Sequence, residues 1–286
     1  MANLIDLRRR IRSVRNTQQV TKAMKTVATA KYKKASRTVA VGRPLWHSAP
    51  DSAGRLANWA GPAAHPLLDV REERSIDVIV MTSDKGLCGA FNANLLVHTL
   101  EFLKSKESAA SICLELIGKK AVHFFKRHPY PVDRAFAEHS DKIEAVELKK
   151  LAGSLMEKFL FRETDAVYAA YNEFKSVLAP RMMITRILPV AAGGGAGGEA
   201  AAPDWEPLPS PLIAAFWPRY VENQIVHAYA ESQAAEQAAR MMAMDSASNN
   251  AEDLIEDLTL NLNKARQAGI TRELLEIMTA VEALKS

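Results

Sequence analysis

Cysteine, proline at both ends, and long apolar runs are scarce in this chain. The two cysteines, Cys88 and Cys113, give no disulfide framework and fit a reducing compartment. No run of about 20 apolar residues occurs, so no membrane-spanning helix is expected. Hydrophobic residues still make up 48% of the sequence, which is enough for a buried core. The scarcities therefore exclude a disulfide-scaffolded protein and an integral membrane protein.

Helix-breaking residues are missing from two long stretches at the ends. Residues 3 to about 42 lack proline and internal glycine, and Gly269 is the one glycine after Pro218. The second stretch can form a single helix of roughly 100 Å, at about 1.5 Å per residue. That exceeds the diameter of a small domain, so we expect the helix to need another helix beside it.

Apolar residues in both stretches recur with alternating steps of three and four, the spacing of coiled coils. In the N-terminal stretch, the polar Gln18 and Thr21 interrupt this stripe, and we expect them to set register. The N-terminal stripe is Leu4, Leu7, Ile11, Val14, Gln18 and Thr21. The C-terminal stripe is Tyr229, Ser232, Ala235, Ala239, Met242, Leu254, Leu258, Leu262, Ile270, Leu274, Ile277, Val281 and Leu284.

Charge also distinguishes the two stretches. Residues 1–37 hold eleven Lys and Arg residues, and Asp6 is the only acid among them. The whole chain carries +4, so the remainder is net acidic, and many of those acids lie between Glu252 and Glu282. The patterns together predict an antiparallel coiled coil of the terminal helices. We interpret the basic start as part of this fold rather than as a targeting peptide.

Residues 75–190 have a different pattern, in which short apolar runs alternate with amphipathic segments. This alternation predicts a mostly parallel sheet with helices on its faces. A loosely patterned stretch, 42–74, precedes it and allows a helix only around 51–60; a glycine-rich linker, 191–211, follows it. The expected strands are 76–81, 112–117, 132–138, 165–171 and 182–188. The expected helices are 93–104, 119–127 and 144–161.

The turn after the first expected strand is the strongest hint of enzyme chemistry. A glycine-bearing turn between strand and helix can hold phosphate, but Gly86 and Gly89 match neither the dinucleotide fingerprint nor the P-loop. Cys88 has no histidine near it in sequence and is better explained by packing. No histidines have the spacing of a metal pair. We therefore expect no catalytic residue, metal or cofactor, although a nucleotide-binding α/β enzyme remains an alternative.

The basic N-terminal stretch raises a second alternative, a coiled-coil protein that binds nucleic acid. Charge runs are usually solvated faces, and here half of the basic residues can pair with acids of the C-terminal stretch. Neither interleaved aromatic residues nor a groove-reading module accompanies them. A protein partner is favoured over nucleic acid.

Three segments resemble the gamma subunit of F-type ATP synthases. Residues 10–24 (RIRSVRNTQQVTKAM) are similar to its N-terminal signature, and residues 263–274 (NKARQAGITREL) to its C-terminal signature. Residues 83–92 (SDKGLCGAFN) resemble a third motif in the middle of the family's sequence. Their order and the chain length match as well.

The resemblance implies an antiparallel coiled coil of N- and C-terminal helices (1–60 and 212–286) with a Rossmann-like α/β domain (75–190) between them. It implies a rotor, the non-catalytic central stalk of a proton-translocating ATP synthase. The expected partners are the alpha and beta subunits, whose hexamer surrounds the coiled coil, and the epsilon subunit and c-ring. The expected location is peripheral, on the cytoplasmic face of a bacterial inner membrane, or on the equivalent matrix side in an organelle.

The same resemblance assigns partner contacts to residues along both helices. The sequence departs from the family pattern at two positions. Gly269 stands where a small helix former is usual, and Lys85 stands where arginine is common. Photosynthetic relatives carry an inserted regulatory cysteine pair, and nothing between Val190 and Pro211 contains a cysteine, so thiol regulation is not expected. The implied contact residues are Arg9, Arg10, Arg12, Met24, Lys25, Arg240, Arg266, Gln267, Thr271 and Glu273.

Overall fold

The fold comes from a computed structural model that describes residues 4–60, 65–107, 110–137, 143–176, 180–190 and 209–285. The chain forms two compact units, one of residues 1–28 with 241–286 and the other of residues 29–240. Two long helices, α1 (Leu4–Ala60) and α5 (Pro209–Lys285), each contribute to both units. Neither of these helices has, within the described residues, a stretch apolar enough to cross a bilayer.

A five-stranded sheet with the order β3-β2-β1-β4-β5 forms the centre of the 29–240 unit. The first four strands are parallel, and β5 pairs with β4 in the antiparallel direction. This mixed sheet confirms the predicted α/β architecture, and the bounds lie within a few residues of those expected. The strands are β1 (Ser75–Met81), β2 (Ser111–Ile117), β3 (Val132–Phe136), β4 (Ala166–Phe174) and β5 (Pro180–Leu188).

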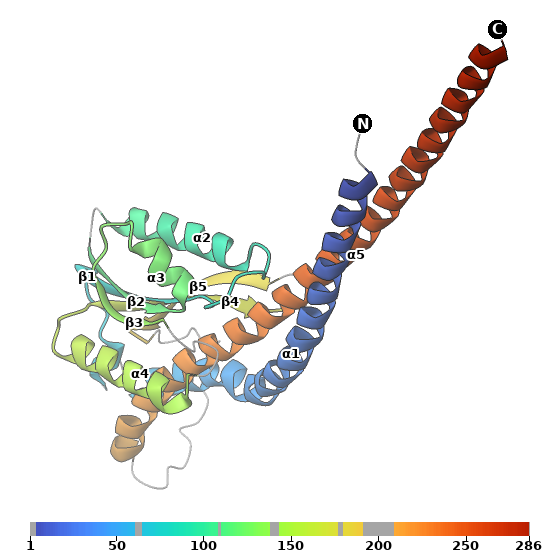
Figure 1. Ribbon diagram of the computed structural model, residues 1–286. Coiled ribbons are helices and arrows are strands. Elements are labelled where there is room, and N and C mark those ends of the chain that lie inside the picture. Colours follow the sequence, from blue (N-terminus) through green and yellow to red (C-terminus); the bar gives the residue numbers. More distant parts are fainter. Residues whose placement is uncertain are drawn as a thin grey trace. The chain divides into compact units, whose positions relative to one another are not determined.

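Helices cover both faces of this sheet. Because strand side chains alternate, Ile76, Val78 and Val80 face α2 and α3, whereas Ile79 and Met81 face α4 and α5. Figure 1 shows α2 and α3 on one side and α4 with part of α5 on the other. Strand β1 is therefore buried on both sides, which explains its nearly unbroken apolar sequence. The covering helices are α2 (Phe91–Lys106), α3 (Lys119–Phe125) and α4 (Ala145–Leu160).

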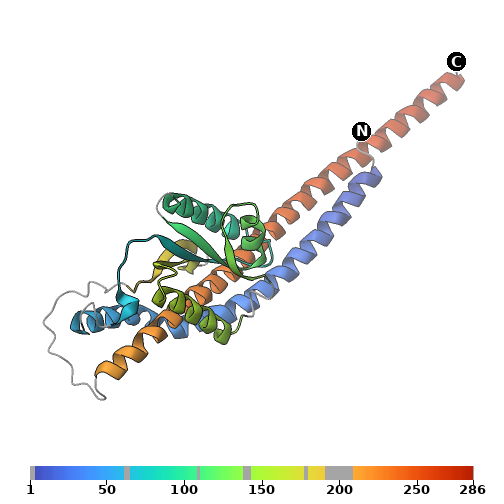
Figure 2. The same ribbon diagram turned by 90° about the vertical axis from the view of Figure 1, so that its left-hand side faces the viewer.

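Helix α1 is longer than its pattern of prolines and glycines alone predicts. We expected a loose stretch after about residue 42, but the helix continues through Pro44 and Pro50 to Ala60. In Figures 1 and 2 its lighter-blue end takes a new direction, as proline and glycine in a helix predict. Packing compensates for the lost backbone hydrogen bonds: Trp46 is buried and stacks on His227 of α5, with 4.5 Å between ring centroids.

Helix α5 begins at Pro209, so most of the predicted linker 191–211 lies outside the described residues. Its first half packs on the sheet, where Trp217, Val221 and Ile225 are fully buried. Further along, Ala234 packs against Val39 of α1. The stripe from Tyr229 to Ala239 is thus shared between the α/β core and α1, and is not a seam with the N-terminal helix alone.

Candidate functional site

In the unit formed by residues 1–28 and 241–286, α1 and α5 run antiparallel (Figure 2). Leu7 and Ile11 of α1 are buried, and Leu258 and Leu262 on α5 are half-buried. This pairing confirms the predicted antiparallel coiled coil.

Three polar contacts bridge successive turns of this coiled coil. The Thr21 and Ser248 hydroxyls are 2.7 Å apart and buried, and the Lys25 ammonium donates to Asp245 at 2.6 Å. On the next turn the Gln18 amide donates to Glu252 at 3.5 Å. Polar side chains at seam positions specify one register because any slip leaves them unpaired. Gln18 and Thr21, the two polar residues within the N-terminal apolar stripe, therefore take part in the contacts that set the register.

The apolar stripe of α5 continues past the end of its partner. Ile270, Leu274, Ile277 and Val281 are between 45% and 60% exposed. We expected these residues to pair with the N-terminal helix. That expectation is wrong for the described residues, because these side chains remain about half exposed. The end of α5 presents an uncovered apolar stripe to solvent.

The structure separates the predicted contact residues into three kinds. Those at the start of α1 and the end of α5 are exposed, whereas Met24 and Lys25 are half-buried in the coiled coil. Arg240 is buried in the 29–240 unit, where it donates to the Glu236 carboxylate at 2.6 Å and to the Lys85 and Gly86 carbonyls. The exposed residues are Arg9, Arg10, Arg12, Arg266, Gln267, Thr271 and Glu273.

The turn after β1 lies where ligands usually bind in such sheets, outside the strand ends and beside the point where strand order reverses. Here its polar groups satisfy one another. The Asn92 amide oxygen accepts from the Ser83 backbone at 3.0 Å, and its nitrogen donates to the Cys88 sulfur at 3.1 Å. Burial raises the pKa of the Cys88 thiol, so it is a poor nucleophile. This local network supports a structural turn.

Helix α5 itself fills the crevice beside this turn. The Ser232 hydroxyl lies 3.4 Å from the Met81 carbonyl at the end of β1, and Glu231 accepts from the Phe174 backbone at 3.0 Å at the end of β4. Arg43 of α1 donates to Glu231 at 3.2 Å and also to the Phe174 carbonyl. Although burial raises the pKa of Glu231, hydrogen bonds from His227, Arg43 and the Phe174 backbone hold it below its usual value. The place of a ligand is taken by the chain's own side chains.

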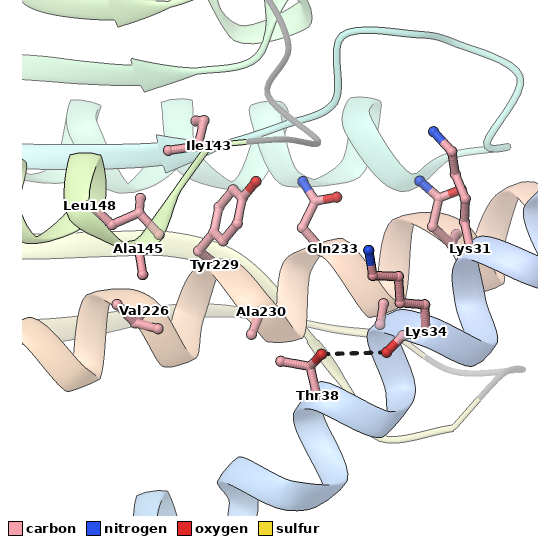
Figure 3. Close-up of a pocket in the computed structure, with 12 residues that line it drawn as sticks. Lys31, Lys34, Thr38, Ile143, Ala145, Leu148, Val226, Tyr229, Ala230 and Gln233 are labelled. Carbon is pink, nitrogen blue, oxygen red and sulfur yellow. Dashed lines mark hydrogen bonds between the residues drawn. The ribbon is translucent and has the colours of Figure 1, made fainter.

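A groove opens on another side of the 29–240 unit, between α1, α4 and α5 (Figure 3). Its volume is about 420 Å³. Ile143, Ala145 and Leu148 line one end, whereas Lys31 and Lys34 stand at the other. The remaining lining residues are Ala35, Thr38, Val226, Tyr229, Ala230, Gln233 and Gln237.

Another cluster of charged groups joins Lys158 of α4 to three acidic residues of the sheet. The Lys158 ammonium is 2.7 Å from Asp133, 3.4 Å from Asp77 and 3.5 Å from Glu115. Glu115 is fully buried, and burial together with a hydrogen bond to Asp133 raises its pKa to about 7. Protonated Glu115 can donate a hydrogen bond to the Asp133 carboxylate, whose own pKa is lowered, first of all by Lys158. Glu115 therefore changes its protonation state near neutral pH.

Comparison with known proteins identifies the family. A family model described as ATP synthase matches residues 3–284. The ATP synthase gamma chain of Pelotomaculum thermopropionicum is 39% identical over 287 residues, which cover all of both chains. The chain belongs to the ATP synthase gamma chain family. The gamma chain of Desulforudis audaxviator is also 39% identical, over 298 residues and again over the full length of both.

Chains in two solved ATP synthase structures share the fold. A chain from the rotor of the Euglena gracilis mitochondrial ATP synthase superposes with a TM-score of 0.64 over 93% of this chain and 98% of that one, at 17% identity. A chain from the central stalk and c-ring structure of the Tetrahymena thermophila enzyme gives 0.57, over 80% and 99% of the two chains, at 22% identity. The signatures at both ends of the sequence therefore identified the family correctly.

Sequence patterns did not reveal the internal polar contacts of this gamma chain. Arg43 and Glu231 are far apart in sequence and match no motif, yet they join α1, β4 and α5. Lys158 lies on an ordinary amphipathic helix, and its three acidic partners come from three strands. The one available signal was an acid within an apolar strand, at Asp77 and at Glu115.

Proposed function

We propose that this gamma chain is the rotating central stalk of a proton-translocating ATP synthase and carries no catalytic centre of its own. The observation that carries this proposal is the long α5 helix. It packs against the N-terminal part of α1, and its C-terminal part then presents an exposed apolar stripe. Exposing such an apolar stripe to water is unfavourable, so the stripe is suited to contact apolar surfaces of partner subunits. The relatives' name and the rotor structure support the same role.

The proposed partner contacts use mostly exposed side chains. Arg9, Arg10 and Arg12 form a basic surface at the start of α1, suited to acidic or carbonyl groups in the bore of an alpha–beta hexamer. On α5, Arg266 and Gln267 with Thr271 and Glu273 would contact loops of a beta subunit. Met24, Lys25 and Arg240 belong to the same proposed contact region, although Lys25 and Arg240 also hold their own units together.

The mechanism requires only unequal contacts. A coiled coil presents different side chains on each side, so each beta subunit meets a different surface as the stalk turns. Contacts that favour one conformation of a beta subunit shift its population toward that state. Epsilon and the c-ring would bind the α/β unit, and the protein would sit peripherally on the cytoplasmic face of a bacterial inner membrane.

The two alternative functions receive less support. The crevice that a nucleotide-binding α/β enzyme would use holds Ser232 and Glu231 of α5. Part of the basic charge of α1 is paired within the protein, as Lys25 is with Asp245, which weakens a nucleic-acid role.

Reconstitution tests the proposal. The chain is mixed with alpha and beta subunits of the same enzyme, and assembly, ATP hydrolysis and rotation of a bead attached to the chain are measured. We expect a stable complex with bead rotation driven by ATP. A chain that does not assemble with the hexamer, or that assembles without turning, would refute the proposed role.

The double variant Arg266→Ala/Gln267→Ala tests the contact. Alanine keeps the helix, so we expect normal assembly with slower turnover. Lys264→Ala, an exposed basic residue on the same helix, is the control and should be close to wild type. Unchanged turnover in the double variant would leave the pair as solvated surface, and lost assembly would make it a structural contact.

A further inference from the structure

The groove between α1, α4 and α5 is lined by none of the contact residues named in the proposed function. Its cavity of about 420 Å³ lies within the usual range for small-molecule sites. All of its lining residues belong to the 29–240 unit. Its chemistry can therefore be considered without the coiled coil of residues 1–28 and 241–286.

The two ends of the groove differ in chemistry. Ala145 and Leu148 of α4, with Val226 of α5, form an apolar wall, and Figure 3 shows them together at one end. At the opposite end, Lys31 and Lys34 stand one turn apart on α1 (Figure 3). Among the described residues that line it, none is acidic. The groove is therefore apolar at one end and lined by two lysines at the other.

Side-chain amides and a hydroxyl lie between these ends. Gln233 and Tyr229 project from α5 into the middle of the groove in Figure 3. They can hydrogen-bond a polar headgroup that the lysines attract. An apolar floor, a few placed polar groups and a charged end are together the usual composition of a ligand site.

From this arrangement we propose that the groove binds a single-chain amphipathic anion, with its acidic headgroup at Lys31 and Lys34 and its hydrocarbon chain along Ala145, Leu148 and Val226. The lysines are exposed, so their contribution is screened by salt. Binding therefore weakens as ionic strength rises, whereas a purely apolar site would not show this dependence.

Calorimetric titration of the full-length chain with decanoate, below its micelle concentration, tests the proposal. We expect saturable one-to-one binding, weaker binding of decanol, and little binding of decylamine. Lys31→Ala/Lys34→Ala should weaken decanoate binding roughly tenfold, since exposed charge pairs contribute modestly. Lys33→Ala removes a neighbouring exposed lysine that does not line the groove and should have no effect.

A steric pair of variants locates the ligand. Ala145 is exposed and lines the groove, so Ala145→Trp should fill it and abolish binding; the next residue, Val146, is exposed outside it, so Val146→Trp should not. Should Ala145→Trp fail to fold, Lys34→Glu gives the same test through charge. No saturable binding up to about 1 mM, or equal binding by both tryptophan variants, would overturn the proposal. Neither result bears on the stalk function, which is tested by assembly and rotation.

Discussion

At the scale of single residues, Glu115 carries a prediction about pH. Its pKa in the folded protein, about 7, lies above the ordinary value of 4.5, so the folded state holds the proton more tightly. The stability from this group is complete below about pH 4.5 and is lost as pH rises through 7. In Glu115→Gln this loss should disappear, giving an advantage over wild type of about 3 kcal/mol at pH 8 and less than about 1 kcal/mol at pH 5.

Urea unfolding of the full chain at both pH values checks this expectation. The groups that face Glu115 are Asp77, Cys113, Asp133 and Lys158, and all are kept in the variant. Taking the difference between variant and wild type cancels the other titrating groups. A difference that does not change with pH would show that Glu115 is not protonated in the folded state near neutrality.

Arg43 carries the second residue-scale prediction. Glu231 is almost fully buried, and its carboxylate relies on the Arg43 guanidinium 3.2 Å away. Arg43→Met removes the guanidinium and leaves His227 and the Phe174 backbone as partners of this carboxylate, and it should cost about 2–4 kcal/mol of unfolding free energy. The double variant Arg43→Met/Glu231→Gln should recover part of the loss in the same denaturation assay. No recovery would mean that Arg43 acts through its bond to the Phe174 carbonyl instead.

At the scale of elements, two glycines are expected to respond in opposite ways to alanine. Gly118, between β2 and α3, has a φ of +95°, and an added Cβ would collide with the Thr82 carbonyl. Gly153 lies within α4 with open space beside it. Gly118→Ala should therefore destabilise the protein by about 1–3 kcal/mol. Gly153→Ala should stabilise it by about 0.5–1 kcal/mol, and thermal unfolding monitored by circular dichroism compares the two.

The element boundaries show what local pattern can predict. The strands and helices of 75–190 were predictable because short apolar runs alternate with amphipathic segments there, and Gly86, Gly89 and Gly118 mark the turns after β1 and β2. The end of α1 was not, because Pro44 and Pro50 normally stop a helix and only tertiary packing of Trp46 and Leu56 keeps this one intact. The exposed apolar stripe at the end of α5 was also missed. The spacing of apolar residues predicts that a helix packs against another, but it does not predict how long the other helix is.

The site was predictable to a smaller degree than the fold. The family signatures gave the exposed basic residues of α1 and the polar residues near Arg266, and their contact role stays a prediction. Arg240 shows the limit of carrying residues over from a family: its guanidinium is buried against Glu236 and the 85–86 carbonyls. Sequence alone cannot distinguish an arginine that meets a partner from one that braces its own fold.

At the scale of the whole molecule, we expect the purified chain to bind no nucleotide tightly and to hydrolyse no ATP. The reason is that α5 occupies the crevice outside β1 and β4. Titration with ATP and a coupled hydrolysis assay on the full chain measure both properties. Turnover that persists after repeated purification and is abolished by Asp84→Ala or Lys85→Ala would contradict the proposed non-catalytic role.

The seating of α5 on the sheet has a consequence for biosynthesis. A ribosome makes residues 75–190 well before residues 217–240, yet Trp217, Val221 and Ile225 cover the face of the sheet that carries Ile79 and Met81. Until that segment leaves the exit tunnel, the nascent sheet has one bare apolar face and is open to chaperones and to aggregation. The unit therefore cannot mature as translation passes its last strand. It must wait for the same helix that goes on to form the end of the stalk.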